Sequence, residues 1–421
     1  MGKLVEKTVA RLMYQEIIQW ELIPTNQFGG CMASSTVDIG LCLVHNMQNA
    51  HAVGLRTGIC LFDISGFFDN VNCPRLIELI HDLGFAPEIV GWCNSFLTDR
   101  RVHLKFNGIL SDPRVSEVGT PQGLPISPVL SIIYTSPLLH KVQDWERSSL
   151  GMYMDDRVLF ACAKNWEMVT ETLSANYTMC TDWLTQAGLA VEPDKTEMLF
   201  FRRQHEWLDP PTAIHLWIPS HSTYYWIKAS SDVHYLGFYI NHKLNWLQHI
   251  EIMCNRAWAS LKSLQILGNS IQGINFAQWR LVYNAVCLPI LMYGCQLWFT
   301  GKQKSQVLKL QRVQNKAVCI ISGSFSMALQ DPLHQILSIF PMSLCLNMLT
   351  LIFALRLYRL PKASQPLKHL QGPWTKLSEN NLPAPAPNWN AAKMALRWLA
   401  SQVHPRGPCI EAFLLTPQDG P

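Results

Sequence analysis

The chain has 421 residues, of which 48% are hydrophobic and 15% charged, so it can bury a large core and does not have the composition of a disordered protein. Its net charge is only +4, but ten acidic against four basic residues lie between Asp144 and Glu197, and nine basic residues against one acid lie between Asn241 and Ile320. This segregation predicts an acidic centre and a basic surface suited to a polyanionic partner. A solvated basic face without a partner is the alternative.

The apolar periodicity and the breaker residues predict an α+β core followed by an α-helical region. In chain order we expect helices over 3–22 and 35–51, a strand over 58–64, helices over 74–84 and 88–97, a hairpin around Asn107–Gly108, a helix over 128–144, a hairpin over 152–163, a helix over 165–187, strands over 195–201 and 234–240, and helices from 247 to 360. The proline-rich segment 361–421 is expected to be a linker or a loosely packed terminus.

Two features bear on the compartment. The thirteen cysteines include no C-x-x-C pair and no zinc-site spacing, so we expect reduced thiols in an intracellular protein. Residues 281–301 are uncharged and long enough to span a membrane, but Pro289 and Gly294 favour a buried helix followed by a turn. We therefore expect no membrane partner.

A pair of aspartates interrupts the apolar hairpin GMYMDDRVLF. Burying Asp155 and Asp156 side by side is costly, because carboxylates lose hydration and repel each other. Mg²⁺ binds carboxylate oxygens, and two such ions can stabilise an in-line phosphoryl displacement. Asp63, which closes the strand GICLFDI, supplies a third carboxylate from another strand. A solvated aspartate pair in a surface turn is the alternative interpretation.

A turn-rich segment, VGTPQGLPISPVL, lies between these aspartates in the sequence. Gly119 and Gly123 permit close backbone approach to a ligand, and Gln122 can hydrogen-bond to a base or a phosphate. Taken in order, LFDISGFFDN, TPQGLPISP, YMDD, GLAVEPDKTEMLFF and HYLGFYINHKLNWLQHI resemble the palm motifs of reverse transcriptases. The resemblance is greatest to the enzymes of non-LTR (LINE-like) retrotransposons of fungi, and it covers about residues 5–360.

This resemblance implies a right-hand polymerase fold, with an antiparallel sheet and packed helices followed by a helical thumb. Its parts would be partial fingers over 1–57, a palm with interleaved fingers elements over 58–240, a thumb or connection over 241–360 and the tail over 361–421. The implied activity is RNA-directed DNA polymerisation: deoxynucleoside triphosphates are added to a DNA primer on an RNA template, with two Mg²⁺ ions or Mn²⁺ in their place. The expected compartment is the nucleus, with the mitochondrion as the alternative.

The resemblance also assigns roles to residues of the palm. Asp63 and Asp155 would be the main ligands of both metal ions, and Asp156 a weaker one. Lys195 would protonate the leaving pyrophosphate, unless it is an ordinary solvated lysine. Phe68 would collide with a ribose 2′-hydroxyl, unless it only packs beside its neighbour.

The remaining roles concern the nascent base pair and the thumb. Gln122 and Gly123 would line the nascent base pair, and HYLGFYINHKLNW would form the hairpin that grips the primer. Lys309, Arg312 and Lys316 recur at helical spacing opposite an apolar stripe, and would lie along the phosphates of the template and primer.

Three departures from the family pattern support other hypotheses. The stretch CMASS at 31–35 lacks the Lys or Arg expected to grip the triphosphate, a loss that Arg56 could offset in part. Arg157 is an unusual neighbour that could compete for the charge of the aspartates. We also expect the fingers to be truncated at the N-terminus, as in a fragment of a longer polyprotein. The alternatives are a catalytically impaired remnant that only binds nucleic acid, and a maturase-like relative.

Overall fold

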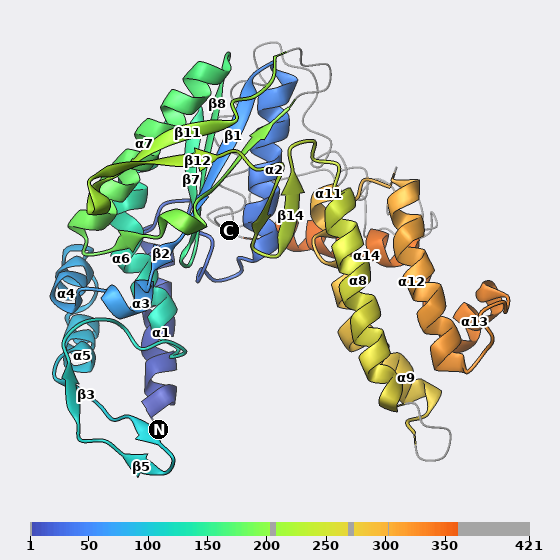
Figure 1. The fold of residues 1–421 in the computed structure, drawn as a ribbon. Helices are drawn as coiled ribbons and strands as arrows, with labels where there is room; N and C mark the ends of the chain where they lie inside the picture. The colour runs from blue at the N-terminus through green and yellow to red at the C-terminus, as the bar shows by residue number, and fades with distance from the viewer. Residues whose placement is uncertain (1, 203–207, 268–272, 302, 361–421) are drawn as a thin grey trace, which may run out of the picture. The chain divides into compact units, whose positions relative to one another are not determined.

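The computed structural model describes residues 2–202, 208–267, 273–301 and 303–360, which divide into two compact units (Figure 1). The first unit contains the described residues up to Gly237 together with Asn241–Leu244, and the second contains Phe238–Ile240 and Asn245–Arg359. The predicted proline-rich tail at 361–421 lies outside the described residues. The functional subdivision into fingers, palm and thumb stays a prediction.

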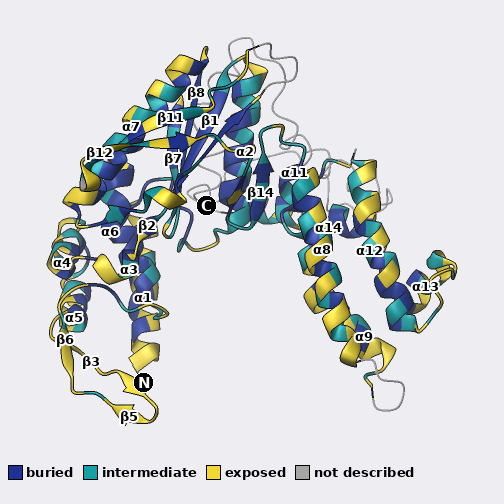
Figure 2. Cartoon of the chain, in the orientation of Figure 1, coloured by how far each residue is buried: buried dark blue, intermediate teal, exposed yellow. Residues whose placement is uncertain are grey.

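The centre of the first unit is a four-stranded sheet. Its order is β10 (Glu197–Phe201), β1 (Arg56–Phe62), β8 (Asp156–Ala163) and β7 (Ser148–Tyr153), and every neighbouring pair is antiparallel. Nearly all residues of β1 and β8 are buried, which explains why their sequences are continuous apolar runs without alternation (Figure 2).

One helix covers each face of this sheet. Tyr177 of α7 (Trp166–Gln186) packs edge-on against Phe62 of β1, at a centroid distance of 5.4 Å. On the other face, Ile39 of α2 (Thr36–Ala52) lies against Gly151 of β7. Because side chains alternate along a strand, Arg157, which pairs with Phe62, belongs to the α7 face.

The first unit has further helices and short strands besides this sheet. Its further helices are α1 (Gly2–Gln19), α3 (Phe67–Asn70), α4 (Cys73–Asp82), α5 (Pro87–Leu97), α6 (Ser127–Val142) and the 3₁₀ turns η1 (Pro193–Lys195) and η2 (Pro219–His221). Its paired short strands are β2 (Ile64–Ser65) with β9 (Ala190–Val191), β3 (Arg100–Val102) with β6 (Arg114–Ser116), β4 (Lys105–Phe106) with β5 (Ile109–Leu110), and β11 (Ala213–Ile218) with β12 (Thr223–Lys228).

The predicted α+β class is confirmed, and most predicted elements are present. The β4–β5 hairpin turns at Asn107 and Gly108, whose φ angles of 48° and 83° are those of the tight turn that Asn-Gly favours. The β11–β12 hairpin was missed, although Ile214, Leu216 and Ile218 are buried in the period-2 alternation of a strand. Each of the described cysteines is free.

The second unit is helical, apart from the strand β14 (Phe238–Asn241), whereas β13 (Asp232–Tyr235) belongs to the first unit. Its helices are α8 (Leu247–Leu264), η3 (Gln265–Leu267), α9 (Phe276–Val282), the π-helical turn η4 (Tyr283–Cys287), α10 (Leu288–Met292), α11 (Cys295–Trp298), α12 (Lys304–Ser322), α13 (Gln330–Leu337) and α14 (Met342–Arg359). A core that includes Leu261, Trp279, Ala317 and Leu337 joins α8, α9, α12 and α13.

The apolar segment of this unit is a broken helix. By length and composition alone, Phe276–Trp298 qualifies as a candidate membrane span, and 39% of its most apolar window is buried. The helix accommodates Pro289 by widening into η4, and it ends at Gly294, whose φ is 69°. The predicted turn is present, the segment is less buried than expected, and the absence of a membrane partner stays a prediction.

Candidate active site

Three chain segments meet at one edge of the central sheet. Leu61 pairs with Glu197 and Phe62 with Arg157, so the end of β1, the turn between β7 and β8 and the start of β10 are adjacent. Asp63 follows β1, Asp155 occupies the turn and Asp156 begins β8, while Lys195 ends η1 just before β10. The predicted carboxylates and the predicted lysine therefore lie at the same edge.

Asp63 and Lys195 form an ion pair. The Nζ of Lys195 donates to Oδ2 of Asp63 at 3.1 Å, and it also pairs with the carboxylate of Glu192. Hydrogen bonds to Glu192 and Asp63 raise the pKa of this exposed lysine. The backbone N–H of Glu192 donates to the carbonyl oxygen of Asp63 at 3.1 Å, which joins the two segments. Sequence analysis did not single out Glu192, although it lies three residues before Lys195.

Negative charge accumulates around Asp156. Burial and then the charges of Asp155 and Asp63 raise the pKa of Asp156 to about 6, and Arg157 opposes this shift. Burial, and then the charge of Asp156, also raises the pKa of Tyr235 on β13, whose hydroxyl is buried and has no hydrogen-bond partner within the described residues. Tyr235 is a second site residue that the sequence analysis overlooked, although its motif HYLGFYI was noted.

Arg157 is buried beneath the hairpin, with 1% of its surface exposed. Its Nη1 donates to the carbonyl oxygen of Asp155 at 2.5 Å, and its guanidinium lies 5.6 Å from the ring centroid of Phe67. Its Nε and Nη2 have no partner among the described residues. Burial lowers the pKa of Arg157 to about 10, against the effect of the nearby carboxylates, first among them Asp155. Arg157 therefore acts on the aspartates from the protein interior: it bonds to the backbone of Asp155, and its charge opposes the raised pKa of Asp156.

The hairpin is held from outside the sheet by the loop that follows α1. The N–H of Phe28 donates to the carbonyl oxygen of Met152 at 2.9 Å, and the N–H of Met152 donates to that of Asn26 at 3.0 Å. A Cβ at Gly29 would lie 2.2 Å from the backbone nitrogen of Met154, much closer than any tolerated contact. Glycine is therefore required at this position for the turn that bears Asp155.

Replacing Gly29 by alanine is expected to destabilise the fold by about 1–3 kcal/mol, because either the loop or the hairpin backbone must move. The matched control is Gly91→Ala in α5, where a Cβ would meet nothing within 4 Å. The control is expected to stabilise the protein by about 0.5–1 kcal/mol through helix propensity. Urea unfolding of both variants measures the difference, and an equal effect of the two substitutions would contradict the close contact at Gly29.

The raised pKa of Asp156 predicts a pH-dependent stability. The ordinary aspartate pKa is about 3.9, so between that value and the folded pKa of about 6 the carboxyl is protonated in the folded protein and ionised in the unfolded chain. Its contribution to stability is therefore complete below pH ~4 and is lost as the pH rises through about 6. In a chelating buffer, Asp156→Asn is expected to gain stability relative to the original protein over this range. Parallel stability curves would show that Asp156 is not perturbed.

The loop with Gln122 and Gly123 is attached to α3. The N–H of Thr120 donates to the carbonyl oxygen of Phe68 at 2.6 Å, and a Cβ at Gly119 would lie 2.7 Å from the carbonyl oxygen of Asp69. Gln122 and Gly123 are exposed beyond this attachment, and Gly123 supplies a φ of 77° in an open surrounding. Glycine is needed at 119 for close approach within the chain, and at 123 for the backbone conformation.

Phe68 is half-buried, and its ring packs edge-on against Phe67 at a centroid distance of 5.3 Å. Phe67 in turn faces the guanidinium of Arg157. The helix α3 is thereby connected to the edge that carries the aspartates. The packing alternative for Phe68 and its predicted role against a ligand are both compatible with this position.

Arg56, which the sequence left as a possible partial substitute for the charge missing from CMASS, lies far from the aspartates. It begins β1, pairs with Ala163, and donates from Nη1 to the carbonyl oxygen of Lys164 at 2.6 Å. This is the opposite end of the strand from Asp63, about 20 Å away at the usual rise of ~3.3 Å per strand residue. The sequence already contains this separation, because the two residues lie at opposite ends of the predicted strand 58–64.

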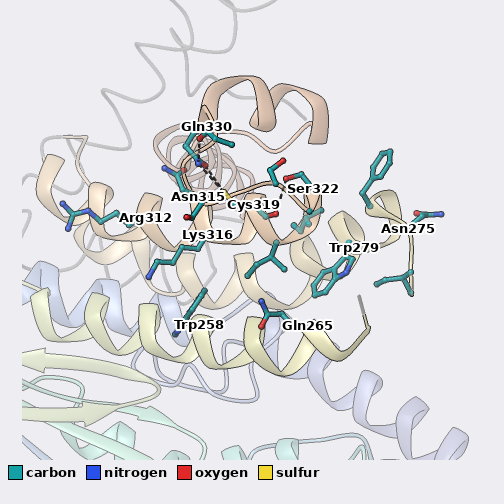
Figure 3. A pocket seen from close by; sticks show the side chains of 18 residues that line it. Trp258, Gln265, Asn275, Trp279, Arg312, Asn315, Lys316, Cys319, Ser322 and Gln330 are labelled. Atoms are coloured by element: carbon teal, nitrogen blue, oxygen red, sulfur yellow. Dashed lines mark hydrogen bonds between the residues drawn. The ribbon is translucent and has the colours of Figure 1, made fainter. Parts of the chain in front are cut away.

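In the second unit, α12 exposes Lys309, Arg312 and Lys316, as predicted from their spacing. Leu310, Ala317 and Ile321 form the buried stripe opposite. The three basic residues are not equivalent, however. Arg312 and Lys316 line a cavity of about 1470 Å³, whereas Lys309 does not belong to its lining (Figure 3). Their role in binding nucleic acid stays a prediction.

The chemistry of the sheet edge fits a hard divalent cation. Asp63, Asp155 and Asp156 offer carboxylate oxygens, and the raised pKa of Asp156 reports negative charge that Arg157 balances only in part. Within the described ranges, no three His, Cys, Asp or Glu side chains have the spacing of a formed metal site, and the Asp63 carboxylate is paired with Lys195. The donor set is thus suitable, while the ligand geometry is not formed.

Comparisons with known proteins agree on one family. The sequence model described as reverse transcriptase (RNA-dependent DNA polymerase) matches residues 1–240, which is more than half of the chain. The probable RNA-directed DNA polymerase from transposon BS of Drosophila melanogaster is 26% identical over 326 residues, which are 76% of this chain and 35% of that protein. The probable RNA-directed DNA polymerase from transposon X-element of the same fly is 21% identical over 336 residues, which are 80% of this chain and 36% of that protein.

Among solved structures, apo telomerase from Candida tropicalis superimposes with a TM-score of 0.42 and 13% identity, over 87% of this chain and 59% of that one. The chain spans about a third of the length of the fly proteins that it matches. The matches to fly transposons lend no support to the predicted fungal source of the chain.

Proposed function

The chain belongs to the reverse transcriptase (RNA-dependent DNA polymerase) family, and from this membership we propose that it is the polymerase part of a non-LTR retrotransposon protein. It would extend the 3′-hydroxyl of a DNA primer with deoxynucleotides along an RNA template. The observation that carries the proposal is the meeting of Asp63, Asp155 and Asp156 at one edge of an antiparallel sheet, from two separate segments.

Asp63 and Asp155 would hold two divalent ions, Mg²⁺ or Mn²⁺, with Asp156 as a weaker contributor. Such ions, when bound, neutralise the charge that develops on the attacking and leaving oxygens. Asp63 would have to exchange its ion pair with Lys195 for this coordination. Lys195 would then lie beside the reacting phosphates with its proton, because an exposed lysine is protonated at neutral pH, and it would donate that proton to the leaving pyrophosphate.

Gln122 and Gly123 would line the nascent base pair, since their exposed turn is fastened to Phe68 by the bond from Thr120. The ring of Phe68 would occupy the space that a ribose 2′-hydroxyl needs. The half-buried position of Phe68 beside the loop of Gln122 leaves part of the ring accessible for this role.

Exchanging Phe68 for valine is expected to lower the discrimination against ribonucleotides at least about tenfold, the effect typical of a change in the wall of an apolar pocket. Extension by a single nucleotide, compared between a deoxynucleotide and the matching ribonucleotide, measures this ratio. Phe106→Val is the control, since Phe106 is 77% exposed on the β4–β5 hairpin. Unchanged discrimination would leave Phe68 with a packing role only.

The exposed cations of α12 would bind the phosphates of the template and primer. Neutralising Lys309, Arg312 and Lys316 together is then expected to reduce the salt dependence of duplex binding by about two to three units of slope.

A remnant that only binds nucleic acid is the second candidate, favoured by the absence of a cation from CMASS and by the position of Arg56. Primer extension on poly(rA)/oligo(dT) with Mg²⁺ separates the two. We expect synthesis by the original chain and none by Asp155→Ala/Asp156→Ala. Equal activity of the two proteins would reject the polymerase, and duplex binding without synthesis by either would establish the remnant.

A further inference from the structure

We propose that the cavity of the second unit binds an unpaired stretch of RNA, with its bases against aromatic side chains and its phosphates on Arg312 and Lys316. The cavity lies between α8, α9, α12 and the segment that leads into α13 (Figure 3). The proposal rests on the proposed function in one respect: the RNA template is the single-stranded partner of that reaction.

The charge of the cavity selects an anion. Arg312 and Lys316 are exposed residues of its lining, and none of the eighteen lining residues is acidic. Within the described ranges Arg312 makes no ion pair, hydrogen bond or ring contact, so its charge is available to a ligand. The Nζ of Lys316 lies 4.8 Å from the ring centroid of Trp258. A cation and an aromatic face thus adjoin at the same wall.

Aromatic side chains line the same space. Trp258 of α8 and the buried Trp279 of α9 line it (Figure 3). Phe276 at the start of α9 also lines it and is 60% exposed. An exposed phenylalanine in a cavity that also carries cations is a poor arrangement for a solvated surface, but it suits unpaired bases, which stack on aromatic rings while their phosphates pair with Lys and Arg.

Two amide side chains can read base edges. Gln265 and Asn315 both line the cavity. The side chain of Gln265 has no hydrogen bond within the described part of the chain. The Oδ1 of Asn315 accepts from Nε2 of Gln311 at 2.7 Å, and its amide nitrogen makes no bond to a described residue. The amide nitrogen of Asn315 can donate to a base edge, and the amide group of Gln265 can both donate and accept.

The size of the cavity argues for a polymer. Its volume of about 1470 Å³ exceeds the ~300–1,000 Å³ of sites for small molecules. A segment of a few nucleotides fits this space better than a free nucleotide does. An acidic peptide would use the cations, but it would leave the exposed aromatic ring and the amides without matching groups. The chemistry therefore favours nucleic acid with unpaired bases.

The division of the basic residues on α12 supplies matched controls. Lys316 lines the cavity, whereas Lys309 on the same helix does not. Phe276 lines it, whereas Phe325, which is 90% exposed in the loop after α12, does not. Each pair holds the residue type constant and compares an exposed residue that lines the cavity with an exposed residue that does not.

The test measures binding of labelled oligouridine and of a short RNA–DNA duplex by fluorescence anisotropy. All variants are made in the full chain that carries Asp155→Ala/Asp156→Ala, so catalysis does not enter. Phe276→Ala is expected to weaken oligouridine binding at least about fivefold, the lower end of the stacking effect per base, and to leave duplex binding within twofold. Lys316→Gln should weaken oligouridine binding more than Lys309→Gln does, and Phe325→Ala should leave it unchanged.

A second variant and a cross-linking experiment distinguish a loss of stacking from a loss of folding. Phe276→Tyr keeps an aromatic ring and is expected to retain oligouridine binding. Oligonucleotides with 4-thiouridine should cross-link to the peptides that carry Trp258 and Phe276. Equal weakening of duplex and single strand by Phe276→Ala, cross-links confined to other peptides, or an acidic peptide whose binding shows the same sensitivity to Phe276→Ala would each overturn the proposal. Since catalysis is absent from this background, failure of the polymerase assay leaves these outcomes unaffected.

Discussion

Replacing Asp155 by asparagine is expected to lower the rate of primer extension at least about a thousandfold, which corresponds to ~4 kcal/mol of lost transition-state stabilisation. Asparagine keeps the shape of the side chain but removes the charge that would hold the divalent ions, and metal coordination supplies several kcal/mol in phosphoryl transfer. Asp63→Asn should have an effect of similar size, because the two carboxylates would share the same ions. Steady-state extension of a primer on an RNA template measures both losses.

The control for these substitutions is Asp69→Asn, an exposed carboxylate on α3, six residues after Asp63. It is expected to retain most of the activity. Duplex binding should survive in all three variants, since the proposed phosphate contacts belong to α12. Activity of Asp155→Asn within tenfold of the original protein would remove Asp155 from the metal site.

Replacing Arg157 by methionine is expected to destabilise the metal-free protein by about 3–5 kcal/mol, the cost of removing one partner from a set of buried charges. Methionine preserves most of the volume, so the loss reports the charge that faces Asp155, Asp63 and Asp156 from below. Without this charge the carboxylates repel one another unopposed. Bound Mg²⁺ supplies positive charge to the same carboxylates, and most of the lost stability should return with it.

Thermal unfolding in chelator and in Mg²⁺ measures this rescue: the melting temperature of Arg157→Met should rise with Mg²⁺ by more than that of the original protein. Arg75→Met is the control, because the guanidinium of Arg75 also lies over aromatic rings, those of Tyr134 and Trp183, without facing the aspartates. Similar magnesium responses of the two variants would show that Arg157 does not compensate the carboxylates.

The sequence predicted those parts of the site that depend on local patterns. Asp155 and Asp156 drew attention because adjacent carboxylates in an apolar hairpin are costly unless something compensates them, and the resemblance to reverse transcriptases joined Asp63 to them. The spacing of Lys309, Arg312 and Lys316 was likewise sufficient to predict an exposed helix face. These features need only the period of a strand or helix, which is contained in neighbouring residues.

Features that depend on distant partners could not be predicted in this way. The environment of Arg157 follows from its pairing with Phe62 and from the helix that covers that face of the sheet. The nearness of Tyr235 to Asp156 likewise follows from long-range packing. The division of the basic residues on α12 similarly required the positions of α8 and α9.

The loop contact at Gly29 has a consequence for the mutations that the gene can tolerate. Every missense change of a glycine codon introduces a residue with a Cβ, and at this position any Cβ meets the backbone of Met154 at 2.2 Å. No single-nucleotide change that alters this codon's amino acid is therefore conservative, in contrast to a position such as Gly91. Among homologous sequences that retain a working protein, we expect glycine at position 29 and free variation at position 91.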